Sequence, residues 1–113
     1  MQLKKRLFGN KNEDKAISFL MKQGFNIVER NFYAKKLGEI DIIAFKDGIL
    51  HFIEVKSSRG SFEPIFNITP KKMDHLIKSA NYYLKVKKLT LPWCIDALII
   101  KGNSIELIEN ITI

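Results

Sequence analysis

Cysteine and long apolar runs are scarce in this sequence. Its 113 residues include one cysteine, Cys94, which excludes an internal disulfide and any zinc site built from several cysteines. No apolar run approaches the ~18 residues that a membrane-spanning helix needs, and no apolar segment of a signal peptide follows the basic N-terminal stretch. We therefore expect a reducing, cytoplasmic location and no membrane partner.

Acidic residues are also fewer than basic residues. The chain carries 19 Lys and Arg residues against 12 Asp and Glu residues, a formal net charge of +7. Such an excess on a small chain favours a polyanionic partner, nucleic acid before an anionic membrane surface. The 46% of hydrophobic residues is typical of a globular chain, and the length fits one domain over residues 1–113.

Apolar periodicity predicts the element order α-β-β-β-α-β-β. Helices are expected over residues 10–23 and 70–87, the second with Thr69 as its N-cap and Pro70 as its first residue. Strands are expected over residues 25–33, 39–45, 49–56, 93–100 and 104–111. The predicted fold class is therefore α/β, with a single mixed β-sheet flanked by helices.

The first hairpin is expected to bring two acids together. If Asp47 and Gly48 form a type I′ turn, Asp41 faces Glu54 across the strands, with Lys56 on the same face, opposite Glu39. The other face, which carries Ile40, Ile42, Ala44, His51, Ile53 and Val55, is expected to be core.

Two carboxylates that face each other must share a proton, find a cation or remain in water. Oxygen ligands without a cluster of histidines or cysteines favour Mg²⁺ or Mn²⁺ over zinc. The alternative is that charges at the open end of a hairpin are merely solvated and contribute little.

Asp41 followed by Glu54-Val55-Lys56 resembles the PD-(D/E)xK nuclease superfamily, in which an Asp on one strand meets a (D/E)xK sequence on its antiparallel neighbour. Further motifs resemble the small bacterial YraN-type, endonuclease-like family. They are Gly9-x-x-Asn12-Glu13-x-x-Ala16, Arg30-Asn31, Gly38-Glu39-Ile40-Asp41, Phe52-Ile53-Glu54-Val55-Lys56, Thr69-x-x-Lys72, Tyr83-Leu84 and Asp96. This resemblance covers nearly the whole chain and implies a restriction-endonuclease-like fold.

The resemblance implies metal-dependent hydrolysis of phosphodiester bonds in DNA, at junctions, flaps or damaged ends. Asp41, Glu54 and the Val55 carbonyl would bind Mg²⁺ or Mn²⁺, and Lys56 would orient the attacking water. The glutamate of the family's first helix lies beside the metal, which would make Glu13 a catalytic residue. From the sequence alone, Asn10-x-x-Glu13 reads equally well as a capping box.

Three basic residues are predicted to contact nucleic acid, namely Lys72 and Lys71 in the first turn of the second helix and Arg59 before it. Free N–H groups at the start of a helix favour phosphate binding there. The alternative interpretation is that these lysines are merely solvated on the polar face of the helix. Two departures from the family pattern concern arginines: Ser57-Ser58-Arg59 follows Lys56 where one residue and then arginine is usual, and Cys94 stands where arginine is typical.

These departures motivate an alternative function, a nucleic-acid-binding module of the same fold without hydrolysis. A homodimer is a further predicted partner, because the resemblance implies a fold similar in size to the archaeal Holliday-junction resolvases, and such folds often work as dimers. His51 is expected to be a packed core histidine and Cys94 a buried strand residue, and neither His51 nor His75 is expected to be a metal ligand.

Overall fold

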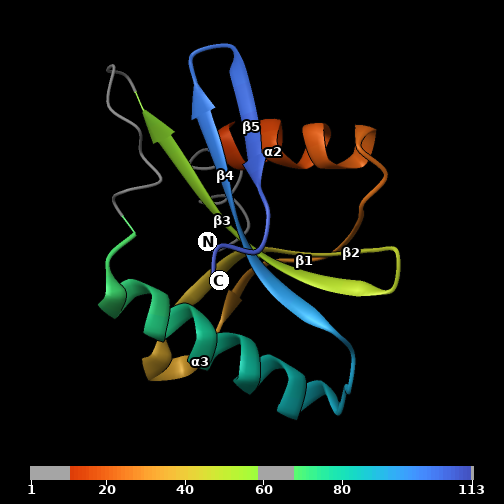
Figure 1. Cartoon of the computed structure of the whole chain (residues 1–113), viewed down its shortest axis with the longest axis vertical. Helices are drawn as coiled ribbons and strands as arrows, with labels where there is room; N and C mark the ends of the chain where they lie inside the picture. The colour runs from red at the N-terminus through yellow and green to blue at the C-terminus, as the bar shows by residue number, and fades with distance from the viewer. Residues whose placement is uncertain (1–10, 59–67, 113) are drawn as a thin grey trace, which may run out of the picture.

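A five-stranded mixed sheet separates two helices in the computed structural model, which describes residues 11–58 and 68–112 (Figure 1). The elements in chain order are α2 (Lys11–Lys22), β1 (Asn26–Tyr33), the 3₁₀ helix η1 (Lys35–Leu37), β2 (Glu39–Lys46), β3 (Ile49–Ser58), α3 (Pro70–Lys87), β4 (Trp93–Lys101) and β5 (Ser104–Ile108). The strands lie side by side in chain order, and all neighbours are antiparallel except β3 and β4. The predicted fold class and element order are confirmed.

The turn between β2 and β3 fixes the register of the first hairpin. Asp47 and Gly48 have φ values of +52° and +78°, and both central residues of a type I′ turn need positive φ. Lys46 pairs with Ile49, as predicted, and the pairing continues away from the turn in the expected register.

Helix α3 begins as the sequence predicts. The Oγ1 atom of Thr69 accepts a hydrogen bond from the Lys72 N–H at 3.1 Å, and Pro70 occupies the first turn, where its missing N–H costs nothing. The helix ends at Lys87, and the C-cap residue Lys88 takes a left-handed conformation. Neither α3 nor α2 has the length and apolar character that crossing a membrane would require.

Each face of the sheet is buried under one helix. The parallel pairing of β3 with β4 needs a crossover connection, which α3 supplies. The α3 side of the core contains Phe32, Ala34, Ile40, Ile43, Leu50, Phe52, Leu76, Ala80, Tyr83, Leu84 and Ile95. The α2 side contains Ala16, Leu20, Phe25, Ile42, Ala44, Ile53, Leu98 and Ile100. With both faces covered, a charged side chain near the middle of the sheet is costly unless it has a partner.

The regular alternation of side chains along β2 fails at Asp41. Ile42 packs on the α2 side, with Val55 against the same cluster, whereas Ile40 packs on the α3 side. Asn31, in the part of β1 between the partners of Ile42 and Ile40, has a φ of +53°. Strand β1 thus departs from regular strand geometry beside the position where β2 changes face. The prediction that Ile40 and Val55 share a core face is therefore wrong.

Candidate functional site

Away from the turn, strands β2 and β3 stop pairing just before Asp41 and Glu54, the two carboxylates among the predicted metal ligands. Beyond this point β2 remains paired with β1, and β3 remains paired with β4, so the two pairs of strands diverge (Figure 1). The predicted cross-strand pairs Asp41–Glu54 and Glu39–Lys56 are therefore not part of the ladder, because each strand follows its other neighbour. Asp41 and Glu54, called the carboxylate pair below, lie where the strands separate.

Asp41 bridges the two strands with its side chain instead of its backbone. Its Oδ2 atom accepts a hydrogen bond from the Val55 N–H at 2.8 Å. Burial raises the pKa of Asp41, while hydrogen bonds from the Val55 backbone and with the Glu54 side chain act in the opposite direction. Because the N–H and C=O groups of one strand residue point toward the same neighbouring strand, we expect the Val55 carbonyl to face Asp41. The three predicted metal-binding residues are thus adjacent.

Glu54 is a buried acid with a strongly raised pKa. Its side chain is buried, with the residue only 6% exposed, and burial together with the negative charge of Asp41 raises its pKa to about 7. Two ammonium groups act against this shift: Lys72 Nζ lies 3.3 Å from Glu54 Oε2, and Lys56 Nζ lies 3.9 Å from it. Near neutral pH the carboxylate pair therefore holds a proton that a cation can displace.

Glu13 on α2 interacts electrostatically with Asp41 of the carboxylate pair. Its Oε1 atom accepts a hydrogen bond from Asn31 Nδ2 at 3.0 Å and lies 3.6 Å from the Arg30 guanidinium. Burial raises the pKa of Glu13, and the charge of Asp41 raises it further. The structure thus places Glu13 within electrostatic reach of Asp41. Asn10, the other half of the predicted capping box, lies outside the described residues.

The structure describes two of the three residues predicted to contact nucleic acid, and only one of them lies at the carboxylate pair. Lys72 reaches the carboxylate pair, Lys71 is exposed on the first turn of α3, and Arg59 lies outside the described residues. Contact of all three residues with nucleic acid stays a prediction.

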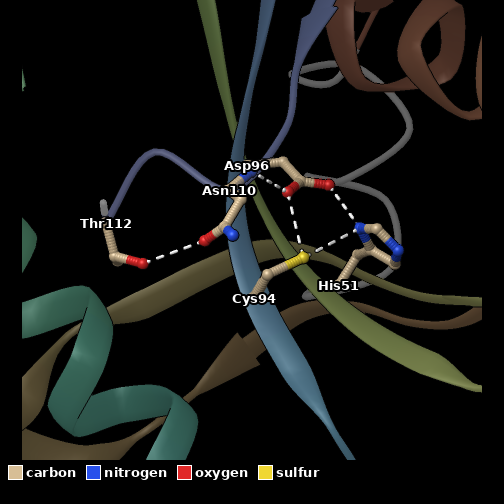
Figure 2. Close-up of polar contacts among 5 residues, drawn as sticks. All are labelled: His51, Cys94, Asp96, Asn110 and Thr112. Carbon is tan, nitrogen blue, oxygen red and sulfur yellow. Dashed lines mark hydrogen bonds and ion pairs between the residues drawn. The ribbon is translucent and has the colours of Figure 1, made fainter.

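A second cluster of polar side chains, missed from the sequence, joins β3 to β4 (Figure 2). The His51 Nδ1 atom lies 2.6 Å from Asp96 Oδ2 and 3.2 Å from Cys94 Sγ, and the Cys94 thiol donates to Asp96 Oδ1 at 3.3 Å. Burial and the charge of Asp96 raise the pKa of Cys94 to about 12. The ligand atoms of the three residues all lie within 4.8 Å of one another, so this cluster could hold a metal ion.

Only part of this cluster could have been predicted from the sequence. Cys94 and Asp96 are two residues apart on one strand and so share a face. His51 joins them because it pairs with Cys94 across the parallel β3–β4 ladder, and nothing in the sequence fixes that register. The prediction that His51 is buried is confirmed, whereas Cys94, expected to be buried, is only partly buried. The interpretation that His51 is not a candidate metal ligand did not take the β3–β4 register into account.

Comparisons with known proteins agree with the resemblance described above. Residues 12–100 match the sequence model of the uncharacterised protein family UPF0102, the YraN family. A UPF0102 protein of Sulfurovum sp. is 54% identical over 108 residues, 96% of each chain. A UPF0102 protein of Wolinella succinogenes is 57% identical over 108 residues, 96% of this chain and 98% of its own. One of Helicobacter hepaticus is 57% identical over 105 residues, 93% of this chain and 94% of its own.

Proposed function

We propose that this chain, which belongs to the uncharacterised protein family UPF0102, is a metal-dependent endonuclease that hydrolyses phosphodiester bonds in DNA. The observation that carries the proposal is the carboxylate pair. Asp41 and Glu54 are held together in a poorly solvated position with two lysines beside them, and burial raises the pKa of both acids. Two negative charges that repel each other in a buried position cost stability, whereas a divalent cation bound between them would remove that cost.

The donor atoms fit magnesium or manganese. Asp41, Glu54 and the Val55 carbonyl would hold the ion through oxygen alone, which is the preference of these hard cations. Glu13 is the residue on α2 best placed to support it. The bound ion would polarise the scissile phosphate and lower the pKa of a water molecule. Its charge would also remove the repulsion that now raises the pKa of Glu54.

Two lysines supply the remaining chemistry. Lys56, whose Nζ lies 3.9 Å from the Glu54 carboxylate, is placed to orient the attacking water and to stabilise negative charge that develops on the phosphate. The ammonium group of Lys72, with Nζ 3.3 Å from Glu54 Oε2, offsets the negative charge of Glu54 in the absence of a metal ion. Once a cation takes over that role, Lys72 is free to contact a phosphate of the bound strand, at the N-terminal end of α3.

The net charge of +7 supports a nucleic-acid partner, with sequence-independent affinity that falls as salt rises. Lys71, Lys72 and Arg59 are the proposed contacts. Branched or damaged DNA is the proposed substrate, and assembly as a homodimer and a cytoplasmic location belong to the same proposal.

One observation favours a binding module without hydrolysis. Cys94, which replaces an arginine typical of the family, lies in a hydrogen-bonded cluster with His51 and Asp96 and offers no cation to a phosphate. Such a module would keep the basic surface and bind DNA without cutting it.

A cleavage screen separates the two functions. Junction, flap, duplex and single-stranded DNA, and matching RNA, are incubated with the wild-type chain and Mg²⁺ or Mn²⁺. Asp41→Asn is the inactive variant, and Asp74→Asn, which changes an exposed acid on α3, is the matched control. We expect DNA cleavage by the wild type and by Asp74→Asn, and none by Asp41→Asn. Salt-sensitive DNA binding without cleavage above the Asp41→Asn level supports the binding module instead.

A further inference from the structure

The cluster of His51, Cys94 and Asp96 is separate from the carboxylate pair. His51 precedes Glu54 by three residues on β3, which is about 10 Å along a strand. Three is an odd number of residues, so the two side chains point to opposite faces of the sheet. The His51 ring meets the ring of Phe25, a member of the α2-side core, whereas Glu54 meets Lys72 of α3. The cluster therefore plays no part in the hydrolysis proposed above.

Three kinds of ligand group converge in this cluster, namely a ring nitrogen, a thiol sulfur and a carboxylate with two oxygens. The distances are 2.6 Å from His51 Nδ1 to Asp96 Oδ2, 3.2 Å from Nδ1 to Cys94 Sγ, and 3.3 Å from Sγ to Asp96 Oδ1. Ligands of a tetrahedral zinc ion lie roughly 3.3–3.8 Å from each other, given zinc bond lengths of about 2.0–2.3 Å. The separation of Nδ1 and Oδ2 would have to widen by at least about 0.7 Å to accept such an ion, whereas the separations of Sγ from Nδ1 and from Oδ1 are within a few tenths of an ångström of this range.

The arrangement does not fit a nucleophile with its general base. In such a relay the histidine contacts the nucleophile with one ring nitrogen and the acid with the other. Here Cys94 and Asp96 both contact Nδ1 of His51. The raised pKa of the Cys94 thiol is also the opposite of what an activated cysteine needs.

The surroundings hold the ligands in place. Asp96 is fully buried, and its Oδ1 atom also accepts a hydrogen bond from the Asn110 N–H at 2.9 Å (Figure 2). The rings of Phe25 and His51 pack edge to face at a centroid distance of 4.9 Å. Cys94 is only partly buried, so the cluster can be reached from solvent. Such support fixes the orientation of metal ligands and raises affinity.

We propose that His51 Nδ1, Cys94 Sγ and an Asp96 carboxylate oxygen form a site for one thiophilic divalent ion, with Zn²⁺ as the preferred metal. The nitrogen, sulfur and oxygen donor set suits zinc and cobalt and is poorly suited to Mg²⁺ or Mn²⁺. Binding releases the thiol proton of Cys94 to solvent and leaves one coordination position for water or a fourth ligand. The chain thus has two metal sites of different chemistry.

A cobalt titration tests this site. Co²⁺ is added to the full-length protein with a phosphine reductant, and the absorption of the sulfur-to-cobalt charge transfer is followed. Because the chain has a single cysteine, this absorption reports Cys94 alone. We expect one Co²⁺ per chain, displacement by one Zn²⁺, loss of the band in Cys94→Ser, and an affinity at least ~10-fold weaker in His51→Gln.

The controls separate this site from the rest of the molecule. His75→Gln changes the other histidine, which is exposed on α3, and Asp41→Asn disrupts the carboxylate pair; both should keep the cobalt band. Failure of the wild type to cleave DNA would therefore leave this proposal standing, and failure of cobalt binding would leave the proposed nuclease standing.

Absence of the charge-transfer band in the wild type with excess Co²⁺ would overturn the proposal, as would an unchanged band in folded His51→Gln. If His51→Gln fails to fold, a second measurement on the wild-type protein tests the site. Zn²⁺ should then slow the reaction of Cys94 with a disulfide reagent by at least ~10-fold, with recovery on addition of a chelator. Equal rates with and without Zn²⁺ would contradict the site.

Discussion

Lys72 Nζ lies 3.3 Å from Oε2 of Glu54, so the first turn of α3 places a cation against a buried acid of β3. Burial and the charge of Asp41 make an ionised Glu54 costly, and Lys72 offsets part of that cost. Lys72 therefore occupies the electrostatic position that a divalent ion would take. The lysine and the ion should compete for Glu54.

Removal of this lysine should change the titration of Glu54. In Lys72→Gln the pKa of Glu54 should rise further above about 7, because its nearest positive charge is lost while the charge of Asp41 remains. Carbon NMR of the side-chain carboxyl reports the shift directly. Lys71→Gln, one residue away and exposed, is the matched control. Identical titration curves for the two variants would show that Lys72 does not contact Glu54 in solution.

The carboxylate pair should make the free energy of unfolding of the metal-free protein depend on pH. The folded pKa of Glu54, about 7, exceeds its ordinary value of 4.5, so the folded chain binds the proton more tightly than the unfolded chain. The free energy of unfolding should therefore fall as pH rises from about 4.5 to about 7, by on the order of 2–3 kcal/mol, and the loss from this group ends above that window. The raised pKa of Asp41 acts with the same sign.

Urea unfolding in a chelator at about pH 5 and about pH 8 measures this loss. In Glu54→Gln the contribution of Glu54 should disappear, because an amide stays neutral in both states. A wild-type difference between the two pH values that Glu54→Gln preserves in full would contradict the prediction.

Lys56 should matter for the reaction and little for folding. Its ammonium group lies 3.9 Å from Glu54 and is partly exposed. Lys56→Gln should lower the cleavage rate by ~10²–10³-fold, as expected when one group that stabilises transition-state charge is removed. Lys78→Gln, which alters an exposed ion pair on α3, should leave the rate unchanged. Equal loss in both variants would indicate weakened DNA binding and not lost chemistry.

Thr69 should contribute to stability through its cap. Thr69→Ala removes the hydrogen bond to the Lys72 N–H and should lower the free energy of unfolding by ~1 kcal/mol. Thr69→Ser retains a hydroxyl and should cost much less. Urea denaturation of the three proteins measures the difference, and equal stability of Thr69→Ala and wild type would mean that the cap is not formed.

Local features of the sequence predicted most of the fold. Asp47 and Gly48 determine the type I′ turn and its register, and Thr69 with Pro70 determines the start of α3, because each effect acts within a few residues. The same local reasoning identified Asp41, Glu54 and Lys56 as neighbours near the end of one hairpin.

Features that depend on distant segments could not be predicted. Ile40 and Ile42 pack on opposite sides of the sheet, although β2 looked regular from its own sequence, and the left-handed Asn31 lies beside them on β1. The parallel register of β3 and β4 brings His51 to Cys94, and the packing of α3 brings Lys72 to Glu54. These contacts depend on how the elements pack, which apolar periodicity does not specify.

Titration calorimetry with Mn²⁺ at about pH 8 tests the central claim, that the carboxylate pair is a metal site, most directly. Wild type and the double variant Asp41→Asn/Glu54→Gln are compared with His51→Gln as control, with and without a DNA junction. We expect one Mn²⁺ site in the wild type and in His51→Gln and none in the double variant. Binding of equal affinity in the double variant, or no binding by the wild type even with DNA present, would contradict the claim.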